Sequence, residues 1–315
     1  MSIFRILSLD GGGVRGAYTA SALAALESKV GAPLVDHFDL IVGTSTGGII
    51  AIGLGLGVAP ARLVEFYKQR GEDIFPRTGW LTSFVQTAKQ LFVGTKHDQE
   101  QLLNALKSEL SDEPFGHSKC PLVIVSYNAS RDGPHLFKTT RPDHQRFKAY
   151  MVALATSAAP TYFSAVPLPL GKDGEEQVFM DGGIWANCPA LVGVAEAVRS
   201  YGKRLEDLKL LSVGTTYKPF TIGQAQTQGS IVLDWDFGRD LAALVGSAQQ
   251  AGTWGTTQFL LGEDHCIRVT STTGDQIPLD DSSRIDDLIA LGARDALERF
   301  DSVERMFFAP GRVRS

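Results

Sequence analysis

Short apolar segments alternate along the chain with longer stretches in which apolar residues recur every three or four positions. The short segments predict buried strands, and the longer stretches predict helices that expose one polar face. Alternation of strands with helices is typical of an α/β fold, so we expect three layers, with helices flanking both faces of a mostly parallel central sheet. The predicted strands cover residues 4–9, 38–42, 121–127, 177–180, 209–213 and 266–269.

The first predicted helix, residues 14–30, is defined by its end as well as by its periodicity. Leu23, Leu26 and Val30 recur at helical spacing, and Gly31 follows them as a stop signal. Together with the strands before and after it, this helix forms a βαβ unit.

Three further segments can be interpreted from their local pattern. Ser283 precedes Asp286 by three positions, ahead of an apolar-periodic stretch, which predicts a capped helix running toward Phe300. Residues 214–230 are rich in glutamine, threonine and glycine and are expected to form a long surface loop. Residues 81–93 combine helical spacing with an apolar cluster, which favours a core helix over a substrate-facing lid.

Length and composition favour one globular domain. The 315 residues, of which 43% are hydrophobic and 21% charged, are enough to bury a substantial core. We expect a single domain over residues 1–315, with the candidate motifs within residues 4–190 and a helical C-terminal part. A net charge of −5 without any basic run argues against a nucleic-acid polymer as partner, because phosphate binding needs clustered lysine and arginine.

The cysteines and the apolar stretches indicate a cytoplasmic protein. Cys120, Cys188 and Cys266 show no CxxC spacing and no neighbouring histidine cluster, so neither a disulfide framework nor a metal site is expected. The N-terminus lacks the charged start and apolar core of an export signal. The longest apolar stretch, residues 49–61, is broken by glycine and proline and is shorter than the ~20 residues of a spanning helix. Any membrane contact is therefore expected to be peripheral.

Three glycine-framed motifs follow predicted strands: DGGGVRG at residues 10–16, GTSTGG at 43–48 and DGG at 181–183. Each motif alone is also compatible with an ordinary turn. Together they supply the groups that acyl transfer requires, namely backbone N–H groups for an oxyanion, a serine on a tight strand-to-helix turn, and an aspartate as base.

The second motif carries the candidate nucleophile, Ser45. It follows the apolar strand at residues 38–42 and precedes a run that can continue as an apolar helix. Gly43 and Gly47 allow a sharp turn that lifts the serine Oγ above the sheet. The helix that follows directs its first N–H groups toward the same place.

The first motif has two interpretations besides a plain βα turn. Gly11, Gly12 and Gly13 allow successive N–H groups to converge on one developing negative charge, while Arg15 adds a cation nearby. With Gly16, the motif also satisfies G-x-G-x-x-G, the pattern of a dinucleotide-binding turn.

The dinucleotide interpretation requires an acidic residue about 20 positions further on, at the end of a second strand. Asp36 and Asp39 instead lie before or at the start of the strand at residues 38–42. The glycine run therefore fits acyl chemistry better.

The third motif supplies the candidate base, Asp181. This residue ends the apolar strand at residues 177–180, and a carboxylate at the end of a strand in a parallel sheet points into the crevice where such folds keep their sites. Gly182 and Gly183 leave room for the serine to approach.

The three motifs in this order resemble the patatin-like phospholipases, which are serine lipid hydrolases with a Ser/Asp dyad in place of a Ser-His-Asp triad. The resemblance extends from about Phe4 to Asn187 at the level of motifs, and more loosely beyond. It implies that Ser45 is the nucleophile and Asp181 the base, in a reaction that cleaves carboxyl esters of phospholipids through an acyl-enzyme. No metal or cofactor is expected, because Asp181 and the glycine-rich turn already supply the base and the electrostatic stabilisation. The implied supporting residues are Gly11, Gly12, Gly13 and Arg15 at the oxyanion hole, with Gly16, Gly43, Gly47, Gly182, Gly183 and Asn187 shaping the motifs.

One position departs from the family pattern. Members usually carry two asparagines before the proline that corresponds to Pro189, and Cys188 replaces the second of them. The departure puts a secondary hydrogen bond in doubt, since Asn187 is retained.

No histidine has the setting expected of a triad base. None lies in a glycine-framed turn or at a strand end that suggests a catalytic role, and each is expected to be a surface or hydrogen-bonded residue. The histidines are His37, His97, His117, His135, His144 and His265.

A narrower resemblance concerns residues 34–39, 74–76 and 278–281. These segments are similar to those of patatin-type effectors in bacterial cyclic-oligonucleotide antiphage signalling. The resemblance implies activation by a cyclic dinucleotide and action at the inner membrane, although the sequence shows no messenger-binding motif. The alternatives are a constitutive non-specific esterase or lipid acyl hydrolase, and a non-catalytic nucleotide-binding protein.

Overall fold

The computed structural model describes residues 3–74, 88–160, 162–219, 239–275 and 277–308. Its strands form one mixed sheet in the order β5-β6-β3-β2-β1-β7-β8, with β4 also beside β3. Pairing is parallel from β3 through β2, β1 and β7 to β8, and it is antiparallel for β4, β5 and β6. The strands are β1 (Phe4–Leu9), β2 (Leu40–Thr44), β3 (Leu122–Asn128), β4 (Gly133–Lys138), β5 (Val166–Pro169), β6 (Glu176–Asp181), β7 (Leu208–Tyr217) and β8 (Cys266–Thr272).

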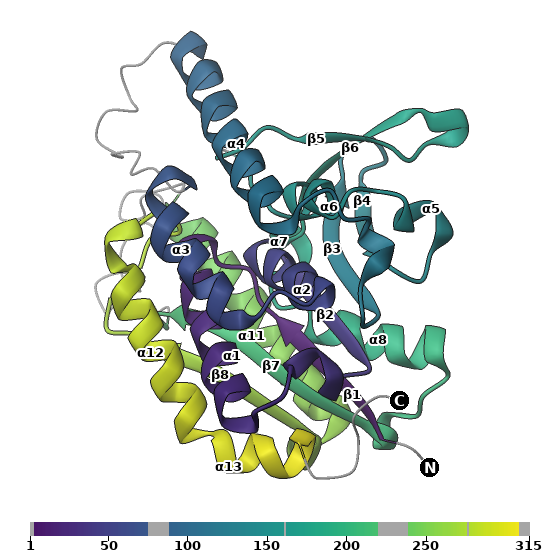
Figure 1. Ribbon diagram of the computed structural model, residues 1–315, viewed down its shortest axis with the longest axis vertical. Helices are drawn as coiled ribbons and strands as arrows, with labels where there is room; N and C mark the ends of the chain where they lie inside the picture. Colours follow the sequence, from purple (N-terminus) through teal and green to yellow (C-terminus); the bar gives the residue numbers. More distant parts are fainter. Residues whose placement is uncertain (1–2, 75–87, 161, 220–238, 276, 309–315) are drawn as a thin grey trace, which may run out of the picture.

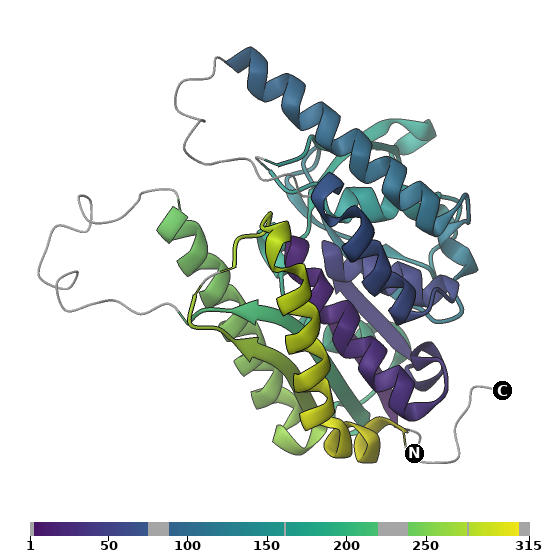
Figure 2. The same ribbon diagram turned by 60° about the vertical axis from the view of Figure 1, so that its left-hand side comes forward.

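Helices cover both faces of the sheet, which confirms the predicted three layers (Figures 1 and 2). One face carries the larger apolar core, built with α1 (Gly16–Val30), α2 (Thr46–Leu56), α3 (Pro60–Ile74), α4 (Ala88–Leu110), α6 (Ala149–Thr156) and α12 (Ile285–Glu298). The opposite face carries a smaller core with α7 (Gly183–Ala186), α8 (Ala190–Tyr201) and α11 (Arg239–Leu261). The short helices α5 (Pro142–Gln145) and α13 (Phe300–Val303) lie at the periphery. Among the described residues no helix is both long and apolar enough to cross a membrane.

The centre of the fold is unusually apolar. All five residues of β2 are buried, as expected for a strand that has parallel neighbours on both sides and helices on both faces. The helix that follows, α2, is buried from Thr46 to Gly55 because it is apolar all round and packs between the sheet and other helices. Ser45, which joins β2 to α2, is therefore fixed from both sides.

Two strands were not predicted from the sequence. β4 contains both a proline and a histidine, and β5 has the sequence VPLP, in which Pro167 and Pro169 point to solvent from an edge strand. Proline is tolerated at a sheet edge because its missing N–H removes no inner ladder bond. The other strand predictions are confirmed, with ends that move by up to four residues.

The predicted loop at residues 214–230 is wrong at its beginning, because β7 continues through Tyr217 in pairing with β8. Residues 220–230 lie outside the described residues, as do residues 81–87 of the predicted apolar helix. α4 begins at Ala88, so the last part of that prediction is helical.

The helix ends show why capping residues are placed only approximately from sequence. α1 ends as predicted, with Gly31 at φ +69° and its N–H donating to the Glu27 carbonyl. Before α12, the Asp281 carboxylate accepts from the Ser283 N–H and caps the 3-10 turn Ser282–Arg284, whereas α12 itself begins at Ile285 without a side-chain cap, so the predicted capping role of Ser283 is wrong. The helix ends at Glu298.

Candidate active site

Strand pairing explains why Ser45 and Asp181 meet although 136 positions separate them. β2 runs parallel to β3 and ends with Thr44 opposite Val125, while β6 runs antiparallel to β3 and ends with Asp181 opposite Ser126. β4 occupies the other edge of β3 over the same residues, so β2 and β6 share one edge and their ends meet there. The strand before Asp181 was predicted to be part of the parallel sheet. Because β6 is antiparallel to β3, its C-terminal end lies beside the C-terminal end of β2, and this places Asp181 next to Ser45.

Ser45 has a backbone conformation that few residues adopt. Its φ of 53° and ψ of −127° are typical of the strained turn that exposes a nucleophile between a strand and a helix. Thr156 Oγ1 accepts from the Ser45 N–H at 3.0 Å, and Thr44 Oγ1 donates to the Ala186 carbonyl at 2.7 Å. Gly47 completes the turn, because a Cβ at this position would collide with the Leu9 carbonyl.

The Ser45 hydroxyl donates to Asp181 Oδ2 at 2.6 Å, and the Gly183 N–H donates to Asp181 Oδ1 at 2.6 Å. Both side chains are nearly inaccessible, with exposed fractions of 8% for Ser45 and 5% for Asp181. Burial raises the pKa of Asp181 from its ordinary 3.8 to about 6, against the opposing effect of the two hydrogen bonds. A carboxylate of this kind is ionised at neutral pH and is more basic than an exposed one.

The glycine-rich turn lies directly against the serine, since a Cβ added to Gly11 would be 3.1 Å from the Ser45 Cβ. Two of its N–H groups are already bound within the protein: Gly11 donates to the Asn187 carbonyl at 3.0 Å and Gly12 to Thr46 Oγ1 at 3.2 Å. For the Gly13 N–H, the described part of the chain provides no acceptor. Gly13 is therefore the donor of this turn that is free to bind a ligand.

Arg15 acts on the glycine-rich turn through backbone carbonyls. Its Nε donates to the Gly12 carbonyl at 3.3 Å and its Nη1 to the Thr216 carbonyl in β7 at 2.9 Å. The carbonyl of a trans peptide points away from the N–H of the next residue, so holding the Gly12 oxygen fixes the direction of the Gly13 N–H. Burial lowers the pKa of Arg15 to about 10, which still leaves the side chain charged at neutral pH.

Asn187 joins the first and third motifs. In addition to accepting from the Gly11 N–H, it donates through Nδ2 to the Gly11 carbonyl at 3.2 Å. Of the remaining predicted supporting residues, Gly16 begins α1, Gly43 lies within β2 and Gly182 precedes α7. The structure thus brings all three motifs to one place.

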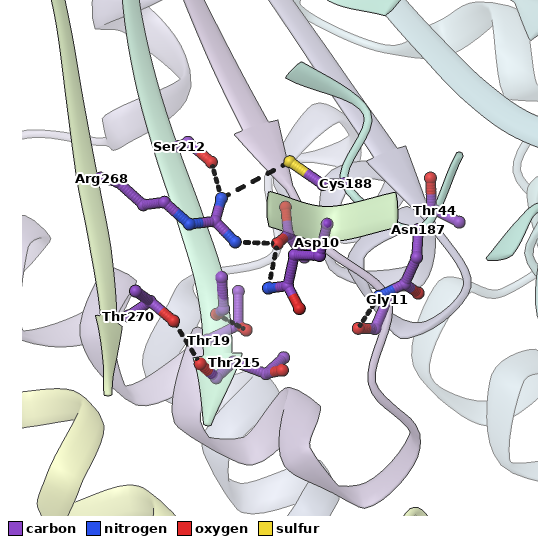
Figure 3. A network of polar contacts seen from close by, with 12 residues as sticks. Asp10, Gly11, Thr19, Thr44, Asn187, Cys188, Ser212, Thr215, Arg268 and Thr270 are labelled. Carbon is purple, nitrogen blue, oxygen red and sulfur yellow. Dashed lines mark hydrogen bonds and ion pairs between the residues drawn. The ribbon is translucent and has the colours of Figure 1, made fainter. Parts of the chain in front are cut away.

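A buried ion pair behind the glycine-rich turn was not predicted (Figure 3). Asp10 is completely buried and pairs with Arg268 of β8, whose guanidinium also donates to Ser212 Oγ and to Cys188 Sγ, the latter at 3.5 Å. Cys188, the departure from the family pattern, therefore accepts a hydrogen bond from this arginine. Burial raises the pKa of the Cys188 thiol to about 12. The available signal was an aspartate at the end of a buried strand, since a buried charge needs a partner.

His144 is hydrogen-bonded, as expected, but it and His135 form a partly buried pair whose hydrogen-bonding capacity is not fully satisfied. His135 and His144 pack against each other and against Phe137, and burial lowers their pKa values to about 3 and about 4, so both are neutral. His144 Nδ1 accepts from the Lys138 N–H, whereas the Nε2 atoms of both rings are buried without a partner in the described structure. Within the same residues no three His, Cys, Asp or Glu side chains gather as metal ligands would.

A hydroxyl on a strained strand-to-helix turn, bonded to a buried carboxylate beside a glycine-rich turn, is the arrangement of a serine-type carboxylic ester hydrolase. The patatin-like phospholipase family model matches residues 7–194, and the chain belongs to that family. The family and the enzyme class predicted from the motifs are confirmed.

Two relatives agree with this assignment, and one solved structure shares the fold. A cGAMP-activated phospholipase of Pseudomonas aeruginosa is 34% identical over 283 residues, which cover 87% of this chain and 80% of that protein. A protein of the same name from Vibrio cholerae is 34% identical over 71% of this chain and 68% of its own length. VipD from Legionella pneumophila aligns with a TM-score of 0.50 at 14% identity, over 96% of this chain and 67% of VipD, and this likeness concerns the fold alone.

Proposed function

We propose that the protein hydrolyses carboxyl esters of phospholipids with Ser45 as nucleophile and Asp181 as base. The observation that carries the proposal is the 2.6 Å hydrogen bond from the Ser45 hydroxyl to the Asp181 carboxylate, made on the strained turn. A nucleophile and a base within hydrogen-bond reach, on a rigid part of the fold, are the signature of covalent acyl transfer. Family membership supports the lipid substrate.

The geometry supports a two-step reaction. Asp181 accepts the hydroxyl proton as Ser45 Oγ attacks the acyl carbonyl, and the negative charge that develops on the carbonyl oxygen is stabilised by the Gly13 N–H. Protonated Asp181 then gives its proton to the leaving alcohol oxygen, which leaves an acyl-serine. In the second step Asp181 takes a proton from water, the resulting hydroxide attacks the acyl carbonyl, and the proton returns to Ser45 as the fatty acid departs.

The raised pKa of Asp181 predicts the pH dependence of this reaction. Only the ionised carboxylate accepts a proton, so kcat/KM should fall by about tenfold per pH unit below the pKa of about 6 and be constant above it. The measurement is the hydrolysis of a soluble p-nitrophenyl ester from pH 4.5 to 8, with circular dichroism at each pH to show that the protein remains folded. A rate that is constant down to pH 4.5 in folded protein would exclude Asp181 as the base.

We further propose that a cyclic dinucleotide activates the enzyme in the cytoplasm and that the active form works at the inner membrane in antiphage defence. The support is the 34% identity to two proteins named cGAMP-activated phospholipases, together with the resemblance of residues 34–39, 74–76 and 278–281 to such effectors. A ligand can activate only by binding the active state more tightly than the resting state.

The test of activation is fatty-acid release from phospholipid vesicles, with and without a panel of cyclic dinucleotides. A soluble short-chain ester, assayed in parallel, reports on the chemistry without the membrane. We expect low release without nucleotide and strong stimulation by one member of the panel. Full release without nucleotide, unchanged by the whole panel, would leave a constitutive lipid acyl hydrolase.

A further inference from the structure

Two adjacent glutamines of α11 contact the two loops that carry the proposed chemistry. Gln249 Oε1 accepts from the Asn187 N–H at 3.0 Å, and its Nε2 donates to the Ile184 carbonyl at 3.4 Å. Both contacts are in the segment that follows Asp181. Gln249 therefore binds residues 181–187, which run from the end of β6 through α7 and are called the carboxylate loop below, through one acceptor and one weaker donor.

Gln250 binds the other loop. Its Nε2 donates to Asp10 Oδ2 at 3.1 Å, the same oxygen that pairs with Arg268. Asp10 is completely buried and opens the glycine loop, residues 10–16. A buried carboxylate requires donors, so Gln250 and Arg268 together determine where the first residue of the glycine loop lies.

Near the site α11 is attached through these hydrogen bonds and through Trp254, which packs against the smaller core and under the Arg268 guanidinium. From residue 245 to residue 256 none of its side chains is fully buried, and the buried positions, Thr257 and Leu261, lie toward its C-terminal end. Successive side chains on a helix diverge by about 100°. Neighbouring glutamines can therefore reach two different loops from one helix turn.

We propose that Gln249 and Gln250 are positioning residues that fix the carboxylate loop and the glycine loop relative to each other. The proton acceptor Asp181 belongs to the first loop and the Gly13 N–H to the second. In the proposed reaction Asp181 takes the proton of Ser45 while the Gly13 N–H binds the oxygen of the carbonyl that Ser45 attacks, so the two groups must be held in a fixed relation. The loops also contact each other directly through the hydrogen bonds between Gly11 and Asn187. The two glutamines of α11 add one further contact to each loop. The inference rests on the proposed function of Ser45 and Asp181.

The shorter bond of Gln249 uses its side-chain oxygen as acceptor, whereas Gln250 uses its side-chain N–H as donor, and this difference gives a sharp test. Glutamate has nearly the same shape as glutamine but only accepts hydrogen bonds when ionised. Gln249→Glu retains the acceptor for the Asn187 N–H, so we expect kcat to fall only about threefold, the cost of one weak bond. Gln250→Glu loses its donor and faces the Asp10 carboxylate, so we expect kcat to fall by about 10²-fold with little change in KM.

The matched control is Gln258→Glu, which makes the same change in the same helix. Among the described residues the Gln258 side chain has no hydrogen bond, so kcat and KM should be those of the unchanged protein. Gln249→Met and Gln250→Met serve as uncharged variants, and each should lower kcat by about tenfold because each loses its contact to a loop. Melting temperatures are measured for all five variants to identify any that fail to fold.

The full-length protein is assayed on a soluble ester, and the rate of fluorophosphonate labelling is recorded as a second readout of Ser45 reactivity. The inference is supported if kcat and labelling fall in the order Gln250→Glu, then the methionine variants, then Gln249→Glu. Equal activity of the three glutamate variants, or losses that only follow the melting temperature, would overturn it. An active Ser45→Ala protein would instead overturn the proposed function itself, so the two failures are distinguishable.

Discussion

Ser45→Ala and Asp181→Asn should each remove nearly all ester hydrolysis, lowering kcat by about 10⁴-fold or more. The reason is that the hydroxyl and the carboxylate act as one unit through their 2.6 Å hydrogen bond, so the loss of either group stops proton removal and attack together. The measurement is kcat and KM on a soluble ester and on phospholipid vesicles. Ser111→Ala is a matched control, because Ser111 also has a φ of 53° but lies at the end of α4.

The same variants should remain folded, and Asp181→Asn should be at least as stable as the unchanged protein at neutral pH. The pKa of Asp181 is raised in the folded state, so the stability contributed by this group is complete below about pH 4 and is lost as pH rises through about 6. Raising the pKa from 3.8 to about 6 corresponds to roughly 3 kcal/mol against the ionised form. Urea unfolding at pH 7.5 measures the difference. A single His→Ala change that matched the loss of Ser45→Ala in folded protein would show that the base is a histidine.

Gly13→Ala is expected to lower kcat by about 10²-fold, the usual effect of losing one oxyanion donor. Gly13 has a φ of +56°, and a Cβ there would collide with the Leu279 carbonyl, so the turn must shift and its N–H must change direction. Because that N–H is needed only when charge develops on the substrate oxygen, KM should change little. Steady-state kinetics on a soluble ester separates the two effects.

Gly31→Ala is the control for this change. Gly31 also has a positive φ, of +69°, but an added Cβ would meet no atom within 4 Å. It should therefore cost about 1 kcal/mol of stability, as for any side chain in the left-handed region, and no activity. If Gly13→Ala lost no more activity than Gly31→Ala, the Gly13 N–H would have no part in the reaction.

Local sequence patterns were sufficient to predict much of the fold and to select the residues to which we assign the chemistry. β1 was predicted with its correct ends, because a short, largely apolar run that ends before Asp10 and a glycine run is a local signal. Ser45 and Asp181 were predicted from their glycine-framed turns for the same reason. Their juxtaposition was not derivable from the strands alone, since it depends on the antiparallel pairing of β6 with β3.

The site contacts that could not be predicted from the sequence join residues that are far apart along the chain. Gln250 and Arg268 are 240 and 258 positions from Asp10, and neither is part of a recognisable motif. Cys188 was identified as a departure, but its contact with Arg268 depends on how β8 is placed beside β7. Side-chain pairings between distant segments follow from the tertiary structure, and no local pattern specifies them.

The most direct test of the central claim is to identify the residue that a fluorophosphonate modifies. The purified protein is treated with the probe, and the adduct is located by peptide mass spectrometry. We predict one adduct per chain, on Ser45, with no labelling of Ser45→Ala and much slower labelling of Asp181→Asn. An adduct on a different residue, or Ser45→Ala labelled as fast as the unchanged protein, would contradict the assignment of Ser45 as the nucleophile.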